Sequence, residues 1–291
     1  MDEAKSGVVH SPPPSGLKAV GVDLGATLAK LAIRAPSGEL HFESMPAHET
    51  ERLARRITSL APEQIGLTGC GAAGFAERLD VPSRRYDEFS SWGAGTRKLV
   101  DAEALSGDSR NLLVSLGTGT SVLLMDGDST VRIGGTALGG GTVVGLASAL
   151  LGTTDFKEIC QLAQRGNRSR VDLVVSDIYR SGEIGLPADL TAASFGKLGL
   201  VDGTPGGKEP ENLAAAILGL VGENVGLICA GLSYASQVER IIFAGSTLHE
   251  NRVLCDILSS ITTNMGRTPL FLPDGEYGGA TGALILSDRE S

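Results

Sequence analysis

The pattern of apolar and polar residues contains two short strand–turn–strand units. In the first unit, the apolar residues 19–22 lead into the turn 23–27, and the largely apolar run 28–33 follows. In the second unit, the largely apolar residues 112–116 stop at the glycine- and hydroxyl-rich segment 117–121, after which the chain is apolar again. Apolar runs separated by such residues are typical of β-hairpins. Because the units lie about a domain's length apart, they predict two related lobes that face each other across a cleft.

The residues in these turns are suited to bind phosphate. Glycine lets backbone N–H groups come close to a ligand, and hydroxyl side chains add hydrogen-bond donors. The candidates from the two turns are Gly25, Ala26, Thr27, Gly117, Thr118, Gly119, Thr120 and Ser121. A third segment, formed by Gly139, Gly140 and Gly141, precedes the predicted helix 142–151, and a helix N-terminus is a second place for an anion. Each segment alone is best interpreted as an ordinary turn, but together they favour a ligand site.

Two charged residues accompany the first turn. A carboxylate at the end of an apolar strand is costly to bury unless it is paired or holds a metal. Asp23 is therefore a candidate to face Mg²⁺, directly or through water. The alternative is that Asp23 only caps its own turn. Lys30 projects either to a phosphate or to solvent, and the sequence favours neither.

A competing motif lies between the two units. Gly69, Gly71 and Gly74 form a G-x-G-x-x-G pattern after the predicted strand 64–68, and the acidic pair 87–88 lies near the distance expected for a ribose-binding residue. Dinucleotide binding is therefore the second interpretation. It ranks below phosphate binding because it leaves the two hairpin turns without a purpose. The fingerprint also normally follows the first strand of its unit.

Two strand ends supply further candidates. Residues 86–89 end a short predicted strand before the predicted helix 90–105, so the carboxylate of Glu88 can point into a cleft. On these residues alone, a surface or capping role is the simpler interpretation. Gly245 and Ser246 follow another predicted strand and are candidates to contact a nucleotide base and ribose, although a plain connection to the next helix also fits.

Composition narrows the class of protein. With 291 residues, of which 42% are hydrophobic, the chain can bury one large core or two ordinary ones. A net charge of -9 and a pI near 5.0 disfavour nucleic acid and anionic membranes as partners. The four cysteines show no metal-binding or redox spacing, as in reduced cytosolic proteins. We find no apolar run that is long enough to span a membrane and no signal-peptide core, so we expect a cytoplasmic protein.

The two turns and the aspartate suggest phosphoryl transfer. This reaction needs held phosphates, Mg²⁺ to neutralise charge and a base that aligns the attacking hydroxyl. The chain contains neither a G-x-x-x-x-G-K-[ST] loop nor the H-R-D and D-F-G motifs of protein kinases. All four histidines lie outside the glycine-rich turns, which disfavours a Ser-His-Asp mechanism.

The chain resembles the type II pantothenate kinases of the acetate and sugar kinase, Hsp70 and actin superfamily. The resemblance runs from about residue 18 almost to the C-terminus, in the order found in the family. Its segments are GVDLGATLAKL (21–31), YDEF (86–89), LGTGTS (116–121), RIGGTALGGGTVVGL (132–146), DLTAASFGK (189–197), FAGS (243–246) and GGATGAL (278–284). It implies an α/β fold with two ribonuclease-H-like lobes and a nucleotide cleft between them. We expect a flexible tail over residues 1–16, an N-terminal ATPase-like lobe over 17–110 and a C-terminal lobe over 111–291.

The resemblance also implies roles. ATP, Mg²⁺ and pantothenate would be the ligands. The product would be 4'-phosphopantothenate, which is made in the first step towards coenzyme A. Asp23–Thr27 would handle Mg²⁺ and the terminal phosphates, and 117–121 would form the second phosphate loop. Glu88 would be the general base and Arg132 would contact pantothenate, where its fork can clamp a carboxylate. Gly245 and Ser246 would lie by the adenosine. Family members are typically homodimers, and the long apolar helix 211–234 would help the dimer.

Three departures from the family pattern leave alternatives open. Ala26 stands where a glycine is usual, Ser194 stands where an asparagine is usual, and Ala137-Leu138 replaces the first two residues of a Gly-Thr-Gly-Gly-Gly loop. The first alternative is a kinase of the same fold that acts on another small hydroxylated substrate, such as an amino sugar. The second is a nucleotide-binding sensor without catalytic activity.

Overall fold

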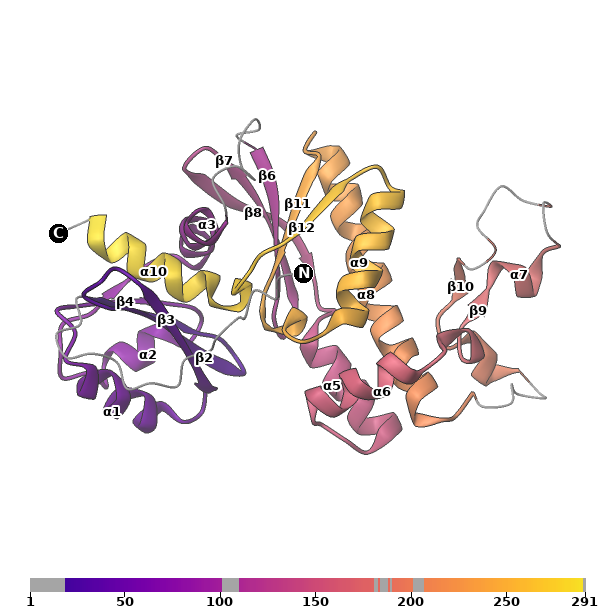
Figure 1. The fold of residues 1–291 in the computed structure, drawn as a ribbon, viewed down its shortest axis with the longest axis horizontal. Coiled ribbons are helices and arrows are strands. Elements are labelled where there is room, and N and C mark those ends of the chain that lie inside the picture. The colour runs from indigo at the N-terminus through magenta and orange to yellow at the C-terminus, as the bar shows by residue number, and fades with distance from the viewer. Residues whose placement is uncertain are drawn as a thin grey trace, which may run out of the picture.

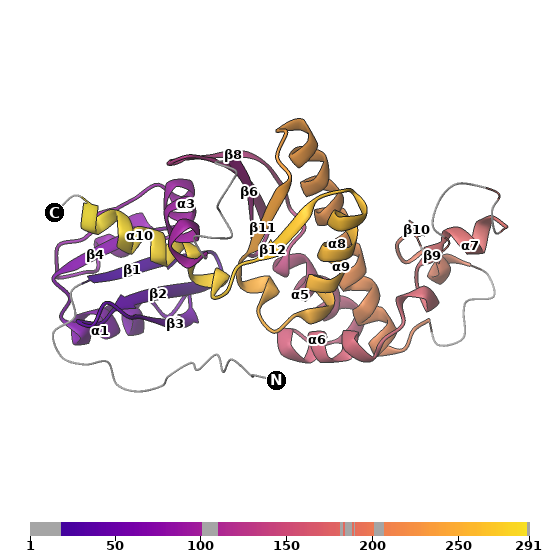
Figure 2. The same ribbon diagram turned by 45° about the horizontal axis from the view of Figure 1, so that its top comes forward.

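The computed structural model describes residues 19–100, 110–180, 183, 188, 190–200 and 207–289. The expected tail, residues 1–16, lies outside the described residues. The described chain forms two five-stranded sheets. Figures 1 and 2 show them as the cores of two lobes that lie side by side.

The first sheet has the strand order β3-β2-β1-β4-β5. Its strands are β1 (Ala19–Leu24), β2 (Leu28–Arg34), β3 (Leu40–Pro46), β4 (Gln64–Thr68) and β5 (Arg84–Arg85). The first three are antiparallel, whereas β4 pairs parallel with β1 and β5 with β4. The predicted first strand–turn–strand unit is thus the β1–β2 hairpin at the centre of this sheet.

The second sheet repeats this order as β8-β7-β6-β11-β12. Its strands are β6 (Arg110–Leu116), β7 (Thr120–Asp126), β8 (Ser129–Thr136), β11 (Arg240–Ala244) and β12 (Thr268–Phe271). Again the first three are antiparallel and the last two pair parallel. The repeated order places the β1–β2 turn and the β6–β7 turn at equivalent positions in the two lobes.

Helices cover both faces of the first sheet. The helix α1 (Thr50–Leu60) buries Leu53, Ile57 and Leu60, which are spaced for one helical face, and the short helix α2 (Ala72–Ala76) precedes β5. The C-terminal helix α10 (Gly278–Arg289) lies on the opposite face, against α3 (Glu88–Leu99), β1 and β4 (Figure 1). Thus α10 follows the second sheet in sequence but packs on the first lobe.

Helices of the second lobe pack around α8 (Pro210–Ala235), which lies beside α5 (Gly140–Leu151), α6 (Phe156–Arg165) and α9 (Arg252–Asn264). By length and composition alone α8 could cross a membrane, which corrects our statement that no apolar run is long enough. However, 78% of its most apolar window is buried inside the structure, as expected for a core helix.

Short elements complete the described chain. Between α6 and α8, an arm projects from the second lobe (Figures 1 and 2). It contains η1 (Arg168–Arg170), β9 (Leu173–Val174), α7 (Val175–Ile178), β10 (Thr191–Ala193) and η2 (Gly196–Gly199). The turns η3 (Ser246–Leu248) and η4 (Gly275–Tyr277) follow β11 and β12.

Candidate active site

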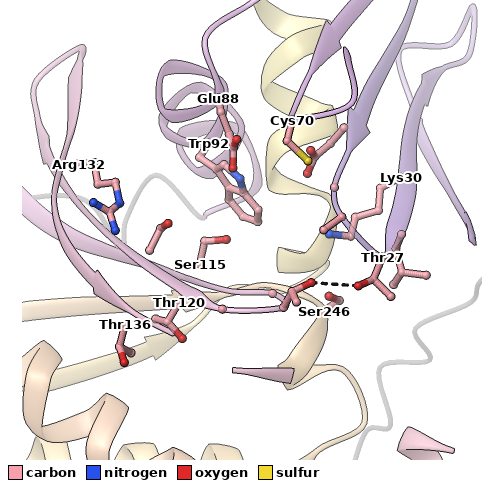
Figure 3. A pocket seen from close by; sticks show the side chains of 18 residues that line it. Thr27, Lys30, Cys70, Glu88, Trp92, Ser115, Thr120, Arg132, Thr136 and Ser246 are labelled. Atoms are coloured by element: carbon pink, nitrogen blue, oxygen red, sulfur yellow. Dashed lines mark hydrogen bonds between the residues drawn. The ribbon is translucent and has the colours of Figure 1, made fainter. Parts of the chain in front are cut away.

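A cleft of about 360 Å³ lies between the two hairpin turns. Predicted site residues form most of its wall, namely Asp23, Gly25, Ala26, Thr27, Lys30, Glu88, Gly117, Thr118, Gly119, Thr120, Ser121, Arg132 and Ser246. The remaining lining residues, which the sequence did not indicate, are Leu28, Cys70, Trp92, Ser115 and Thr136. The structure therefore brings together residues from both lobes that are far apart in the sequence (Figure 3).

Asp23 and Lys30 face each other across the β1–β2 pair and both line this cleft. Their residues are only 4% and 7% exposed. Burial raises the pKa of the Asp23 carboxyl group, and the positive charge of Lys30 partly opposes that rise. Within the described part of the chain, the Lys30 ammonium group makes no ion pair within 4.0 Å, so it is available to an anion in the cleft.

Two glycines hold the Asp23 carboxylate. A Cβ atom on Gly69 would lie 2.6 Å from Oδ1, and one on Gly279 would lie 2.6 Å from Oδ2. Gly69 also has a φ of +88°, which favours glycine. A Cβ atom on Gly71 would lie 3.1 Å from the Cβ atom of Leu24. The first two glycines of the G-x-G-x-x-G pattern therefore pack against the end of β1, which explains them without a dinucleotide.

The sequence suggested that Glu88 lies at the end of a strand, but it is the first residue of α3. The helix is capped by Asp87, whose carboxylate accepts a hydrogen bond of 2.8 Å from the Ser90 N–H, so it begins two residues before the predicted start at residue 90. Desolvation, Asp23 and Asp87 raise the pKa of Glu88, and Lys30 lowers it. A raised pKa makes the carboxylate a better proton acceptor than an ordinary glutamate, as a general base requires.

Trp92 lies one helical turn after Glu88 and lines the same cleft. Figure 3 shows both side chains projecting from α3, with Arg132 and Lys30 on either side in this view. Residues four apart share a helix face, and that spacing could have identified Trp92 from the sequence. A Cβ atom on Gly278 would lie 2.7 Å from the Trp92 ring, so the ring packs directly against the start of α10.

The start of α5 braces the second turn. The N–H of Gly140 donates to the carbonyl oxygen of Gly117 at 2.8 Å, and the N–H of Gly141 donates to that of Thr118 at 2.9 Å. A Cβ atom on Gly139 would lie 2.7 Å from the Thr118 oxygen. These two amides donate to the protein and support the second turn, a role that the sequence did not indicate, and the anion site predicted here stays a prediction.

One predicted phosphate-binding hydroxyl is likewise occupied. The Thr120 side chain donates to the carbonyl oxygen of Leu138 at 2.7 Å, and Thr120 is only 5% exposed. It therefore also ties the second turn to the segment before α5. The Thr27, Thr118 and Ser121 hydroxyls remain at the cleft wall.

The second lobe forms the wall that carries Arg132. Arg132 lies on β8, and Ser115 and Ser121 oppose each other on β6 and β7. Among the described residues, Arg132 has no ion-pair partner and its side chain faces the cleft (Figure 3). A free guanidinium beside hydroxyl groups is suited to bind the carboxylate of a small polar substrate.

A second cavity of about 550 Å³ adjoins the cleft and has a mostly apolar wall. It is lined by Gly140, Gly141, Val144, Gly145, Thr154, Phe156 and Thr247, and it shares Thr27, Leu28, Gly117, Thr118 and Ser246 with the cleft. The two hollows therefore meet at the phosphate turns. A nucleoside could occupy the apolar cavity while its phosphates reach the charged cleft.

Gly139 and Gly245 line neither the cleft nor this cavity. Gly245 has a φ of +112°, and a Cβ atom there would lie 2.2 Å from the carbonyl oxygen of Leu116. This glycine is needed for the close approach of β6 and β11. Of the predicted nucleoside contacts, the structure thus places Ser246 at both hollows and gives Gly245 a role in packing.

The described residues contain no group of three or more histidine, cysteine or acidic side chains that could hold a metal. Asp23 offers one carboxylate in the cleft. Mg²⁺ commonly binds through one or two carboxylates, with waters and substrate phosphates as its other ligands. The site therefore fits a cation that arrives with a nucleotide better than a permanently caged one.

Comparison with known proteins agrees with this arrangement. A family model described as Fumble matches residues 109–286. Two type II pantothenate kinases of Staphylococcus aureus, from the strains bovine RF122 / ET3-1 and USA300, are each 32% identical to this chain over 267 residues. The match covers 92% of this chain and 98% of each relative.

Solved structures share the fold. A ROK family glucokinase from Streptomyces griseus in complex with glucose and AMPPNP has a TM-score of 0.61 at 13% identity, over 94% of this chain and 100% of that chain. The activator of the 2-hydroxyisocaproyl-CoA dehydratase from Clostridium difficile with bound ADPNP has a TM-score of 0.62 at 13% identity, over 94% of this chain and 95% of that chain. The predicted α/β fold of two lobes with a cleft is thereby confirmed.

Proposed function

This chain belongs to the Fumble family and is a type II pantothenate kinase, and from this premise we propose that it transfers the γ-phosphate of ATP to pantothenate with Glu88 as the general base. The product is 4'-phosphopantothenate. The observation that best supports the proposal is the junction of two hollows at the phosphate turns, with Glu88 and Arg132 in one of them and an apolar wall in the other.

We propose a place for each substrate that the two hollows support. The adenosine of ATP occupies the apolar cavity near Val144 and Phe156, and its triphosphate runs between the two turns. Pantothenate occupies the charged cleft, where Arg132 binds its carboxylate and its primary hydroxyl lies near Glu88. Substrates held in this order place the attacking oxygen next to the γ-phosphorus, which removes most of the entropic cost of the reaction.

The proposed reaction is a single displacement. The carboxylate of Glu88 accepts the proton of the pantothenate hydroxyl while the hydroxyl oxygen bonds to the γ-phosphorus and the bond to ADP breaks. Lys30 and the turn hydroxyls bind phosphate oxygens as negative charge moves towards ADP. Asp23 would hold Mg²⁺, which neutralises charge on the phosphates when it is bound.

We also propose that the enzyme is a homodimer through α8. Although most of this helix is buried, Leu227 and Tyr234 are 50% and 53% exposed and lie seven residues apart on one face. Together the two side chains form an apolar surface that a second copy of α8 would cover. Light scattering during gel filtration would give the mass of a dimer, and Leu227→Glu should shift it towards the monomer.

The proposed function is tested by ADP release from purified protein with Mg-ATP, in the presence and absence of pantothenate. Pantothenate-dependent release that is lost in Glu88→Gln, with ATP binding retained, supports both the substrate and the base. Release that depends instead on an amino sugar would favour the kinase of another hydroxylated substrate. ATP binding without release for any acceptor would favour the sensor.

A further inference from the structure

A hydrogen bond joins the two phosphate turns across the cleft. The Oγ1 atoms of Thr27 and Thr118 are 3.0 Å apart, although the residues are 91 positions apart in the chain. Figure 3 shows this contact as the dashed line between the first and the second hairpin. Both residues are exposed, so packing does not force the two hydroxyl groups together. The contact is therefore a property of the two turns themselves.

This bond lies at the boundary between the two hollows. Thr27 and Thr118 line both the charged cleft and the apolar cavity. A nucleotide with its base beside Phe156 and its terminal phosphate beside Glu88 must pass its phosphates through this boundary. The two hydroxyl groups are hydrogen-bonded to each other at the position through which the phosphates would run.

We propose that the Thr27–Thr118 bond is a latch between the lobes that the triphosphate of ATP replaces. This inference rests on the proposed use of ATP. In the latched state one hydroxyl donates and the other accepts. When the triphosphate enters, each hydroxyl donates to a phosphate oxygen instead. Hydrogen bonds to a charged acceptor are stronger than those between two neutral hydroxyls, so the exchange favours the nucleotide.

The two sides of the latch are held differently. The carbonyl groups of Gly117 and Thr118 accept hydrogen bonds from the start of α5, which fixes the second turn. In the first turn, the carbonyl oxygen of Thr27 accepts one hydrogen bond from another segment, from the N–H of Ala47 at 2.9 Å, and the neighbouring Ala26 is exposed. We therefore expect the first turn to move when the latch opens.

The latch distinguishes the two substrates. The cleft is open to solvent beside Ala26 and Glu88, both of which are exposed, so pantothenate can enter without breaking the bond. ATP cannot bind across both hollows until the bond breaks. Closing the latch permanently should consequently block ATP and leave pantothenate binding in place.

A disulfide in place of the hydrogen bond tests this difference. Thr27→Cys and Thr118→Cys are combined in a Cys70→Ser background, because Cys70 lies in the same cleft. Hydroxyl oxygens 3.0 Å apart indicate that two sulfur atoms at these positions come within bonding reach after small adjustments. Trp92, the only tryptophan, lines the cleft, so its fluorescence can report the binding of either ligand.

We expect the oxidised double variant to bind pantothenate with the affinity of its reduced form and to bind Mg-ATP at least about 100-fold more weakly. Reduction with dithiothreitol should restore ATP binding. The two single-cysteine variants in the same background serve as controls and should bind ATP equally under both conditions. Isothermal titration gives the two affinities independently of fluorescence, and mass spectrometry confirms the disulfide.

Two results would overturn the latch. One is equal ATP affinity of the oxidised and reduced double variants, and the other is a folded double variant that forms no disulfide under oxidation. If oxidation abolishes the binding of both ligands, the decision passes to Thr27→Val, which keeps the side-chain shape without the hydroxyl. ATP should then associate severalfold faster than with the wild type or the matched Thr27→Ser variant, and an equal or slower rate rejects the latch.

The outcome is separable from that of the proposed function. The latch is measured by ATP binding, whereas the function is measured by pantothenate-dependent ADP release. A wild-type protein that binds ATP but releases no ADP with pantothenate would reject the substrate and leave the latch result valid.

Discussion

The two phosphate turns connect equivalent strands, yet the protein holds them in different ways. The carbonyl oxygen of Gly117 accepts hydrogen bonds from the N–H of Gly140 and from the hydroxyl of Thr247, both at 2.8 Å. The carbonyl oxygen of Thr118 accepts a third from the N–H of Gly141 at 2.9 Å. The second turn is therefore fixed by two other segments of its own lobe.

The first turn is supported from other segments only at its two ends, among the described residues. The N–H of Gly71 donates to the carbonyl oxygen of Leu24 at 3.1 Å and the N–H of Ala47 donates to that of Thr27 at 2.9 Å, whereas the N–H of Gly25 donates to Leu28 within the hairpin at 3.0 Å. The same lobe carries Asp23, Lys30 and the proposed base. The comparison suggests a division of labour, in which a fixed cradle in one lobe holds phosphate and a more mobile turn belongs to the lobe with the acid–base groups.

Replacing the proposed base should have the largest effect of the changes considered, because it removes the acid–base group that the first lobe contributes. Glu88→Gln keeps the size of the side chain but cannot accept the proton, so we expect kcat to fall by about 10²- to 10⁴-fold with little change in ATP affinity. Steady-state kinetics and ATP titration measure the two quantities. Glu63→Gln, an exposed change outside the cleft, is the matched control. Near-normal turnover of Glu88→Gln would remove Glu88 from the reaction.

Adding a methyl group beside each turn tests whether the second turn is held more rigidly than the first. In Gly139→Ala the new Cβ atom would lie 2.7 Å from the Thr118 oxygen and 2.8 Å from the Gly119 backbone, so the second turn must shift. A shift of about 1 Å can cost about 10²-fold in rate, and we expect a loss of that order in kcat/KM for ATP.

Gly25→Ala is the counterpart in the first turn. Its Cβ atom would meet only the Leu28 oxygen, at 3.1 Å, so we expect a change of a few-fold at most. Equal losses in the two alanine variants would show that both turns are equally constrained and would refute the comparison.

Local patterns in the sequence were sufficient to predict the parts of the fold that depend on neighbouring residues. Both hairpins and the strand Gln64–Thr68 lie where the sequence placed them. The strand β8 was missed because none of its residues is buried, so it has no apolar alternation to reveal it.

Contacts between distant segments could not be predicted. The sequence does not show that α10 returns to the first sheet, because the packing of Gly279 against Asp23 joins opposite ends of the chain. For the same reason, the sequence could not show that the N–H groups of Gly140 and Gly141 donate to the second turn. Local sequence identifies a donor but not its partner, and the partner decides the role.

The charges of the first lobe should set the pH dependence of the reaction. A general base must be deprotonated, so activity is lost as the pH falls through the pKa of Glu88, which is raised above that of an ordinary glutamate. Lys30 lowers this pKa, so Lys30→Met should move the acid limb of kcat/KM for pantothenate to higher pH.

Asp23 raises the same pKa, so Asp23→Asn should move the limb to lower pH. If the acid limb of the residual activity moves in opposite directions in the two variants, the limb belongs to Glu88. A limb that stays fixed in both variants belongs to another group.

The smallest expected effect concerns the supports of the turns themselves. Thr247→Val removes the hydroxyl that donates to Gly117 at 2.8 Å, at a buried residue that is 4% exposed. Loss of one neutral hydrogen bond should lower the free energy of unfolding by about 1 kcal/mol and the melting temperature by about 2 °C.

Cys70→Ala is the matched change beside the first turn, where the thiol, a weak donor, lies 3.6 Å from the carbonyl oxygen of Leu24. Its effect on unfolding should stay within about 0.5 kcal/mol. Urea unfolding without ligand measures both variants, and a loss in Cys70→Ala as large as that in Thr247→Val would mean that side chains support the two turns equally.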